Sequence, residues 1–138
     1  YEKFTIHPSV SLLHNQTYCL LKNAFAAIVT SGTATLETAL FKVPQLVCYK
    51  SSAVSYAIAK RIVKLDFISL VNLIMGKEVV KELIQDDCSV EQICAELERI
   101  CETEKRATLL KDYQELAVKL GETNASQNVA KSILEALQ

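Results

Sequence analysis

The sequence predicts an α/β domain: a partial parallel sheet of about three to four short strands, flanked by helices and followed by a helical carboxyl-terminal segment. Two short apolar runs, 26–30 and 45–49, lie on either side of a stretch of helical composition, and a glycine turn joins the first run to that stretch. After residue 88 only helical periodicity remains. We expect one domain over residues 1–138, with a sheet-containing part, 1–88, and a helical tail, 89–138.

Strands and helices are predicted to alternate in the first part. A short strand at 10–13 and a helix at 16–23 precede the strand at 26–30, which is apolar enough to be buried on both faces. The next helix, 33–41, carries Leu36, Ala39 and Leu40 at helical spacing, and Pro44 separates it from the strand at 45–49. This alternation is typical of a parallel sheet, whose ligands bind at the carboxyl ends of the strands.

After residue 50 we predict a helix from Ser51 or Ser52 to about residue 63, a strand at 67–70, a turn at 71–76 and a short helix at 78–83. In the tail, Ser89 and Gln92 form a capping box. The apolar stripe of the first tail helix consists of Val90, Ile93, Cys94, Leu97, Ile100 and Cys101. A second helix, from about 104 to 120, is predicted to bury Leu110, Tyr113, Ala117 and Leu120. Gly121 ends that helix, and a third begins at Asn124.

Composition excludes several classes of protein. No apolar run approaches the roughly 18 residues that a transmembrane helix needs. Residues 1–64 carry seven Lys or Arg against two Glu, whereas residues 65–138 carry eight against fourteen acidic side chains, so a nucleic-acid binder is not expected. The five cysteines show no C-x-x-C spacing and are interpreted as reduced thiols rather than a disulfide frame or a zinc site.

The turn at Ser31, Gly32 and Thr33 is the main candidate for a binding site. A strand that leads into a helix through glycine leaves the first N–H groups of the helix unpaired at the positive end of its dipole, where phosphate binds. Glu37 follows one turn later, within reach of ligand hydroxyls. The same residues also cap helices and make turns for structural reasons, and the amide of Asn72 could equally bind a ligand or hold its turn together.

Two strings in order, SGTATLETALFKVPQLVCY and YAIAKRIVKLDFISLVNLIMGKEVVKELIQ, resemble the carboxyl-terminal domain of the lipid A disaccharide synthases. These are GT-B glycosyltransferases with two Rossmann-like domains, and the resemblance assigns residues 1–88 to the part that binds the donor nucleotide. One departure is Val71, where the family usually has a proline before the asparagine.

The resemblance implies an inverting hexosyltransferase of lipid A and lipopolysaccharide biosynthesis. The UDP-sugar donor would be an acylated UDP-glucosamine, and a lipid-linked glucosamine phosphate would be the acceptor. No cofactor, metal or nucleic acid is implied, and the full enzyme would be cytoplasmic, at the cytoplasmic face of the inner membrane. The general base is expected in the amino-terminal domain, which this sequence does not contain, so the chain alone should be inactive.

Carried over residue by residue, the resemblance places Ser31, Gly32 and Thr33 at the diphosphate and Glu37 at the ribose hydroxyls. Asn72, Glu82 and Gln85 would lie near the nucleotide or sugar. Two alternatives stay open: a UDP-sugar-binding domain of another GT-B enzyme, such as an amino-sugar transferase or epimerase, and a non-catalytic assembly module.

The resemblance also implies a donor domain with six parallel strands, of which this chain supplies only some. The strand at 26–30 would then lack a neighbour and expose unpaired backbone groups, and the strand at 10–13 would have no fixed place. Either the strand at 10–13 pairs beside 26–30 within the chain, or two copies join this edge or exchange segments, with the last helix free to dock on a neighbour. Of these alternatives we expect the homodimer.

Overall fold

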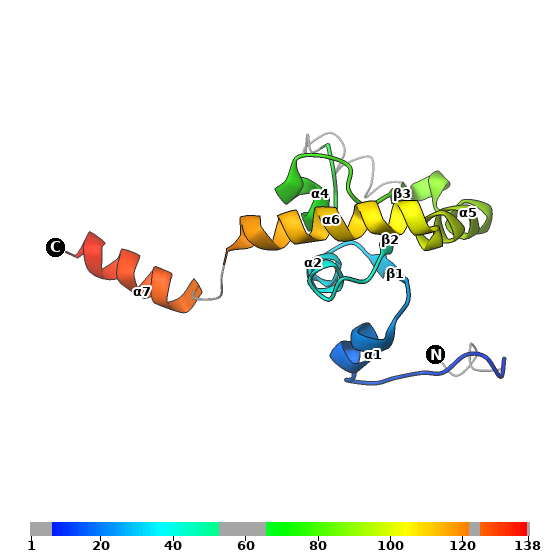
Figure 1. The fold of residues 1–138 in the computed structure, drawn as a ribbon, viewed down its shortest axis with the longest axis horizontal. Helices are drawn as coiled ribbons and strands as arrows, with labels where there is room; N and C mark the ends of the chain where they lie inside the picture. Colours follow the sequence, from blue (N-terminus) through cyan, green and yellow to red (C-terminus); the bar gives the residue numbers. More distant parts are fainter. Residues whose placement is uncertain (1–6, 53–65, 122–124, 138) are drawn as a thin grey trace.

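The computed structural model describes residues 7–52, 66–121 and 125–137. Most of the helix predicted from Ser51 or Ser52 to residue 63, and the cap at Asn124, lie outside these residues. The described chain has a small parallel sheet with helices packed around it and a helical carboxyl-terminal portion (Figure 1). This confirms the predicted fold class.

The sheet contains three described strands, β1 (Ala27–Thr30), β2 (Gln45–Tyr49) and β3 (Glu82–Ile84), in the order β1-β2-β3. Both pairings are parallel, with Ala27 opposite Gln45 and Val47 opposite Glu82. The carboxyl ends of all three strands therefore meet at one edge of the sheet. Strands β1 and β2 lie where the sequence predicts them, but the prediction that β1 is buried on both faces is wrong: Val29 is buried, whereas Ile28 is exposed because it points to the opposite face.

The described helices are α1 (Thr17–Asn23), α2 (Thr33–Leu40), α4 (Leu70–Met75), the 3₁₀ helix η2 (Gln85–Asp87), α5 (Val90–Cys101), α6 (Thr103–Leu120) and α7 (Ala125–Ala136). Helix α6 crosses the body of the molecule, packing against α2, α4 and α5, while α7 extends away from it (Figure 1). None of the helices that the structure describes combines the length and the apolar character needed to cross a bilayer.

Four predicted elements are wrong. Residues 10–13 form no strand and are exposed, because they pair with none of the strands in the described part of the chain. The predicted strand at 67–70 and turn at 71–76 are replaced by a loop and α4, which Ser69 caps by accepting the Asn72 N–H at 3.3 Å. The predicted helix at 78–83 does not form: residues 78–81 are irregular and β3 begins at Glu82, because pairing with β2 buries Leu83 and outweighs a weak local preference.

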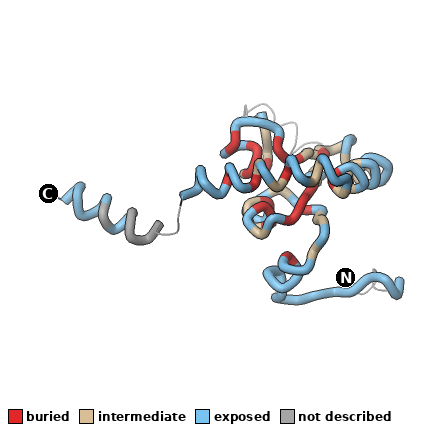
Figure 2. Tube along the Cα trace, in the orientation of Figure 1, coloured by how far each residue is buried: buried red, intermediate tan, exposed pale blue. Residues whose placement is uncertain are grey.

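The core lies where α6 crosses the sheet, and the buried residues gather there in Figure 2. Helix α6 buries Leu109, Tyr113 and Leu116, so only Tyr113 among its four predicted inward residues is fully buried. Leu120 is 41% exposed, because the helix extends beyond the body before Gly121 ends it with a positive φ. Burial raises the pKa of Tyr113 to about 12, and neighbouring Gln45 opposes this shift.

The predicted start of the first tail helix is confirmed, and its apolar stripe is confirmed in part. Ser89 precedes α5 and accepts the N–H of Gln92 at 3.3 Å. Ile100 is buried, and three residues of the stripe are half-buried against the core: Ile93, Leu97 and Cys101. Val90 and Cys94 are exposed instead, because they lie on the outer side of the helix.

Candidate functional site

The predicted phosphate turn lies at the carboxyl end of β1 and leads directly into α2. Gly32 is the residue before the helix, with φ of 139°, a backbone conformation that side chains with a Cβ rarely adopt. Having no side chain, Gly32 cannot cap the helix, and the first turn of α2 contains no acidic residue. The amino end of α2 is thus exposed, without a side-chain cap, and electropositive.

Neighbouring hydroxyls hold this turn in place. The Ser31 hydroxyl donates to the carbonyl of Ile68 at 3.0 Å, which ties the turn to the loop before α4. The Thr35 hydroxyl donates to the carbonyl of Gly32 at 2.8 Å, within the first turn of α2. Thr33 is exposed beside Gly32, so its backbone and hydroxyl are accessible to a ligand.

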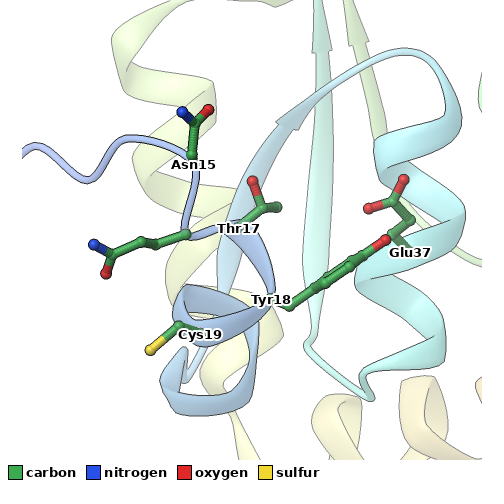
Figure 3. A pocket seen from close by; sticks show the side chains of 6 residues that line it. Asn15, Thr17, Tyr18, Cys19 and Glu37 are labelled. Atoms are coloured by element: carbon green, nitrogen blue, oxygen red, sulfur yellow. The ribbon is translucent and has the colours of Figure 1, made fainter.

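Glu37 lies one turn further along α2, half-buried, at the side of an open cavity of about 530 Å³. The other lining residues come from α1 and the turn before it: Asn15, Gln16, Thr17, Tyr18 and Cys19. In Figure 3 the ring of Tyr18 extends from α1 toward Glu37 on α2. Sequence reasoning missed the α1 residues, because nothing local indicates that α1 packs beside α2.

Asn72 is completely buried, and within the described residues its side-chain amide bonds to the segment between α4 and β3 and to Glu82. Its Oδ1 accepts the N–H groups of Val79 and Val80 at 2.8 and 2.9 Å. Its Nδ2 donates to the carbonyl of Val80 and to Oε1 of Glu82, both at 2.8 Å. Two acceptor and two donor positions are thereby occupied, which is the full capacity of the amide. This geometry favours the turn-holding alternative for Asn72.

Glu82, the first residue of β3, extends the same network toward the phosphate turn. Its carboxylate accepts the N–H groups of Ile68 and Ser69, both at 2.9 Å, in addition to the Asn72 amide. Because Ser31 donates to the carbonyl of Ile68, the predicted site residues Ser31, Glu82 and Asn72 belong to one connected set of hydrogen bonds. A carboxylate with several N–H donors is strongly held.

Gln85, directly after β3, bonds to Ser51 in the loop after β2. Its Oε1 accepts the N–H of Ser51 at 2.8 Å, and its Nε2 donates to the carbonyl of Ser51 at 3.3 Å. Gln85 itself has a positive φ of 55°, so the chain turns sharply where β3 ends. The two-point bond fixes the loop after β2 to the start of η2, at the same edge of the sheet as Ser31.

The cysteines are free thiols, as expected from their spacing. Cys48 and Cys88 are half-buried against the core, whereas Cys19 and Cys94 are exposed. Burial raises the pKa of Cys48 to about 11, and a hydrogen bond with Cys88 acts in the same direction. Cys48 is therefore protonated near neutral pH and unsuited to nucleophilic chemistry. The described residues bring together no three His, Cys, Asp or Glu side chains that could hold a metal ion.

A parallel sheet, a glycine turn at the carboxyl end of a strand and an acidic residue on the helix that follows define the chain as a Rossmann-like α/β domain with a candidate phosphate site. The family model for lipid-A-disaccharide synthetase matches residues 2–137, and the chain belongs to this family.

Relatives from several bacteria support this assignment. A lipid-A-disaccharide synthase of Syntrophus aciditrophicus is 40% identical over 132 residues, which cover 95% of this chain and 34% of that protein. The lipid-A-disaccharide synthase of Sodalis glossinidius is 39% identical over 91% of this chain and 33% of that protein, and that of Geobacter sulfurreducens is 38% identical over 93% and 34%. The chain spans about a third of the length of these relatives.

Proposed function

We propose that this chain is the donor-binding part of an inverting hexosyltransferase that transfers an acylated glucosamine from UDP to a lipid-linked glucosamine phosphate in lipid A biosynthesis. Family membership supports the reaction class. The observation that carries the donor-binding role is the uncapped amino end of α2 after Gly32, with Glu37 on the next helical turn.

In this proposal the diphosphate of the donor lies against Ser31, Gly32 and Thr33. Backbone N–H groups there would donate charge-assisted hydrogen bonds to the phosphate oxygens. The same groups would stabilise the negative charge that develops on the departing UDP, which is the catalytic contribution of this chain. The Glu37 carboxylate would accept hydrogen bonds from the two ribose hydroxyls and so fix the nucleoside.

Asn72, Glu82 and Gln85 support the site indirectly in this proposal. They lie near the donor at the edge of the sheet, but their side chains hold the loop before α4 and the ends of β2 and β3. A donor would then meet a rigid surface rather than these side chains themselves. The general base and the acceptor site belong to another part of the full protein, so the chain alone would be inactive. The full enzyme would act at the cytoplasmic face of the inner membrane.

Calorimetric titration with UDP tests this function. Replacing Glu37 by alanine is expected to weaken UDP binding by about ten- to a hundred-fold, or roughly 1.5 to 3 kcal/mol, because the ribose loses its acceptor. Glu98→Ala removes the same charge from an exposed position on α5 and should leave the affinity unchanged. Equal UDP affinity in Glu37→Ala and the parent chain, with both folded, would contradict the ribose assignment.

The same titration separates the alternatives. An assembly module would bind no UDP at all. A donor domain of another GT-B enzyme would bind UDP, but the family match over residues 2–137 argues against it. We retain the lipid A reaction as the proposal because that match extends through the stretch from Asn72 to Gln85, which other donor domains would not share.

We also propose that this chain by itself forms a homodimer through the open edge of β1. Among the described strands β1 pairs only with β2, and Ile28 is 53% exposed on it. Light scattering over a concentration series is expected to show the mass of a dimer at high micromolar concentration. Ile28→Lys places a charge on the edge and should yield a monomer. A strictly monomeric parent chain would overturn the proposal.

A further inference from the structure

We propose, building on the UDP-binding function above, that the cavity beside Glu37 is the nucleobase subsite and that the uracil ring stacks on Tyr18. The cavity lies between α1 and α2 and is lined by five residues of α1 and its preceding turn together with Glu37 (Figure 3). The residues proposed to bind the diphosphate and the ribose all lie outside α1. The α1 side of the cavity therefore has no role in the function proposed above.

The positions along α2 match the order of groups in a nucleoside diphosphate. The phosphate turn ends at Thr33, and Glu37 follows about 6 Å along the helix axis at 1.5 Å per residue. Phe41, directly after α2, is about another 6 Å further, and Tyr18 stacks on it. The diphosphate would thus contact the phosphate turn and the ribose would contact Glu37. The base would then reach the aromatic pair of Tyr18 and Phe41.

Tyr18 is suited to stacking because its ring is held on one side only. Its centroid lies 5.4 Å from that of Phe41, with the planes 11° apart, so Phe41 fixes the orientation of the ring. Tyr18 is nevertheless 59% exposed and lines the cavity. A fixed aromatic ring with an open face is the surface on which bases stack in nucleic-acid-binding proteins, largely independently of base identity.

Polar side chains that line the same cavity as Tyr18 would supply partners for the edge of a base. Asn15 and Gln16 each carry a carboxamide, which offers both donors and an acceptor, and Thr17 carries a hydroxyl. Within the described parts of the chain, no hydrogen bond engages the side chains of Asn15, Gln16 or Thr17. They are therefore available to the N3–H and carbonyl oxygens of uracil, once the base is stacked.

Titrations of the whole chain with UDP and with inorganic pyrophosphate test the subsite. Tyr18→Ala is expected to weaken UDP binding about ten-fold, because the base loses its stacking partner, and to leave pyrophosphate binding unchanged. Tyr18→Phe keeps the ring and should retain the parent affinity for UDP. Tyr18→Leu keeps an apolar side chain at this position but has no aromatic face, so it serves as the loss-of-stacking variant if the alanine variant does not fold.

The outcomes distinguish this inference from the function on which it rests. If the parent chain binds UDP and the folded alanine or leucine variant binds it equally well, the subsite is overturned while the donor-binding function stands. If the variants lose pyrophosphate and UDP in parallel, Tyr18 only supports the fold around α2 and the subsite is likewise overturned. If the parent chain binds neither ligand, both proposals fail.

Discussion

Replacing Asn72 by alanine is expected to lower the free energy of unfolding by about 3 kcal/mol or more. The substitution removes four hydrogen bonds in a fully buried site. The N–H of Val80 loses its acceptor and the carbonyl of Val80 loses a donor, whereas the N–H of Val79 keeps the carbonyl of Lys77 at 3.0 Å. Each buried group left unpaired costs about 1 to 3 kcal/mol, so the whole turn between α4 and β3 should lose its structure together. Denaturant titration followed by circular dichroism measures the loss.

Asn23→Ala is the matched control for this prediction. Asn23 also donates from its side-chain amide to a backbone carbonyl, that of Cys19 at 2.8 Å, but at an exposed position where water can replace it. We expect a loss below about 1 kcal/mol there. A stable Asn72→Ala variant with weakened UDP binding would contradict the turn-holding role and support direct contact between Asn72 and the donor.

A comparably large effect is expected from Leu116→Ala in α6. Leu116 is completely buried among the core residues, so its truncation should cost about 2 to 5 kcal/mol from lost apolar burial and the cavity left behind. Leu120→Ala, one turn further along the same helix, is the control: Leu120 is 41% exposed and should cost less than about 1 kcal/mol. If Leu120→Ala proves the more destabilising of the two, the orientation of α6 on the core is wrong.

Local signals were sufficient for the centre of the fold and for the turn at Ser31, Gly32 and Thr33. The β-branched run that forms β1, the glycine turn, the helical stretch of α2 and the proline before β2 each act within a few residues. The start of α5 is equally local, because Ser89 bonds to an N–H only three residues away. For the same reason Ser31, Gly32, Thr33 and Glu37 could be proposed from the sequence.

Other features depend on contacts between distant residues and were decided by the tertiary structure alone. The stretch containing Leu83 has the composition of a short helix, yet it is a strand because β2 offers a partner and a buried position. Tyr18 became a site candidate only because α1 packs beside α2. The rotation of α6 depends on which side chains reach the sheet, so Leu116 rather than Leu120 is buried.

Asn72 shows the same contrast between local sequence signals and tertiary contacts. From the sequence, Asn72 is a polar amide close to apolar stretches, and a ligand contact and a turn contact are equally compatible with that pattern. Only the folded chain places the N–H groups of Val79 and Val80 and the carboxylate of Glu82 around that amide. The sequence determined the elements and groups that short-range bonding specifies. Tertiary structure decided strand pairing, helix rotation and the partners of buried polar atoms, because burial and pairing are properties of segments that meet only on folding.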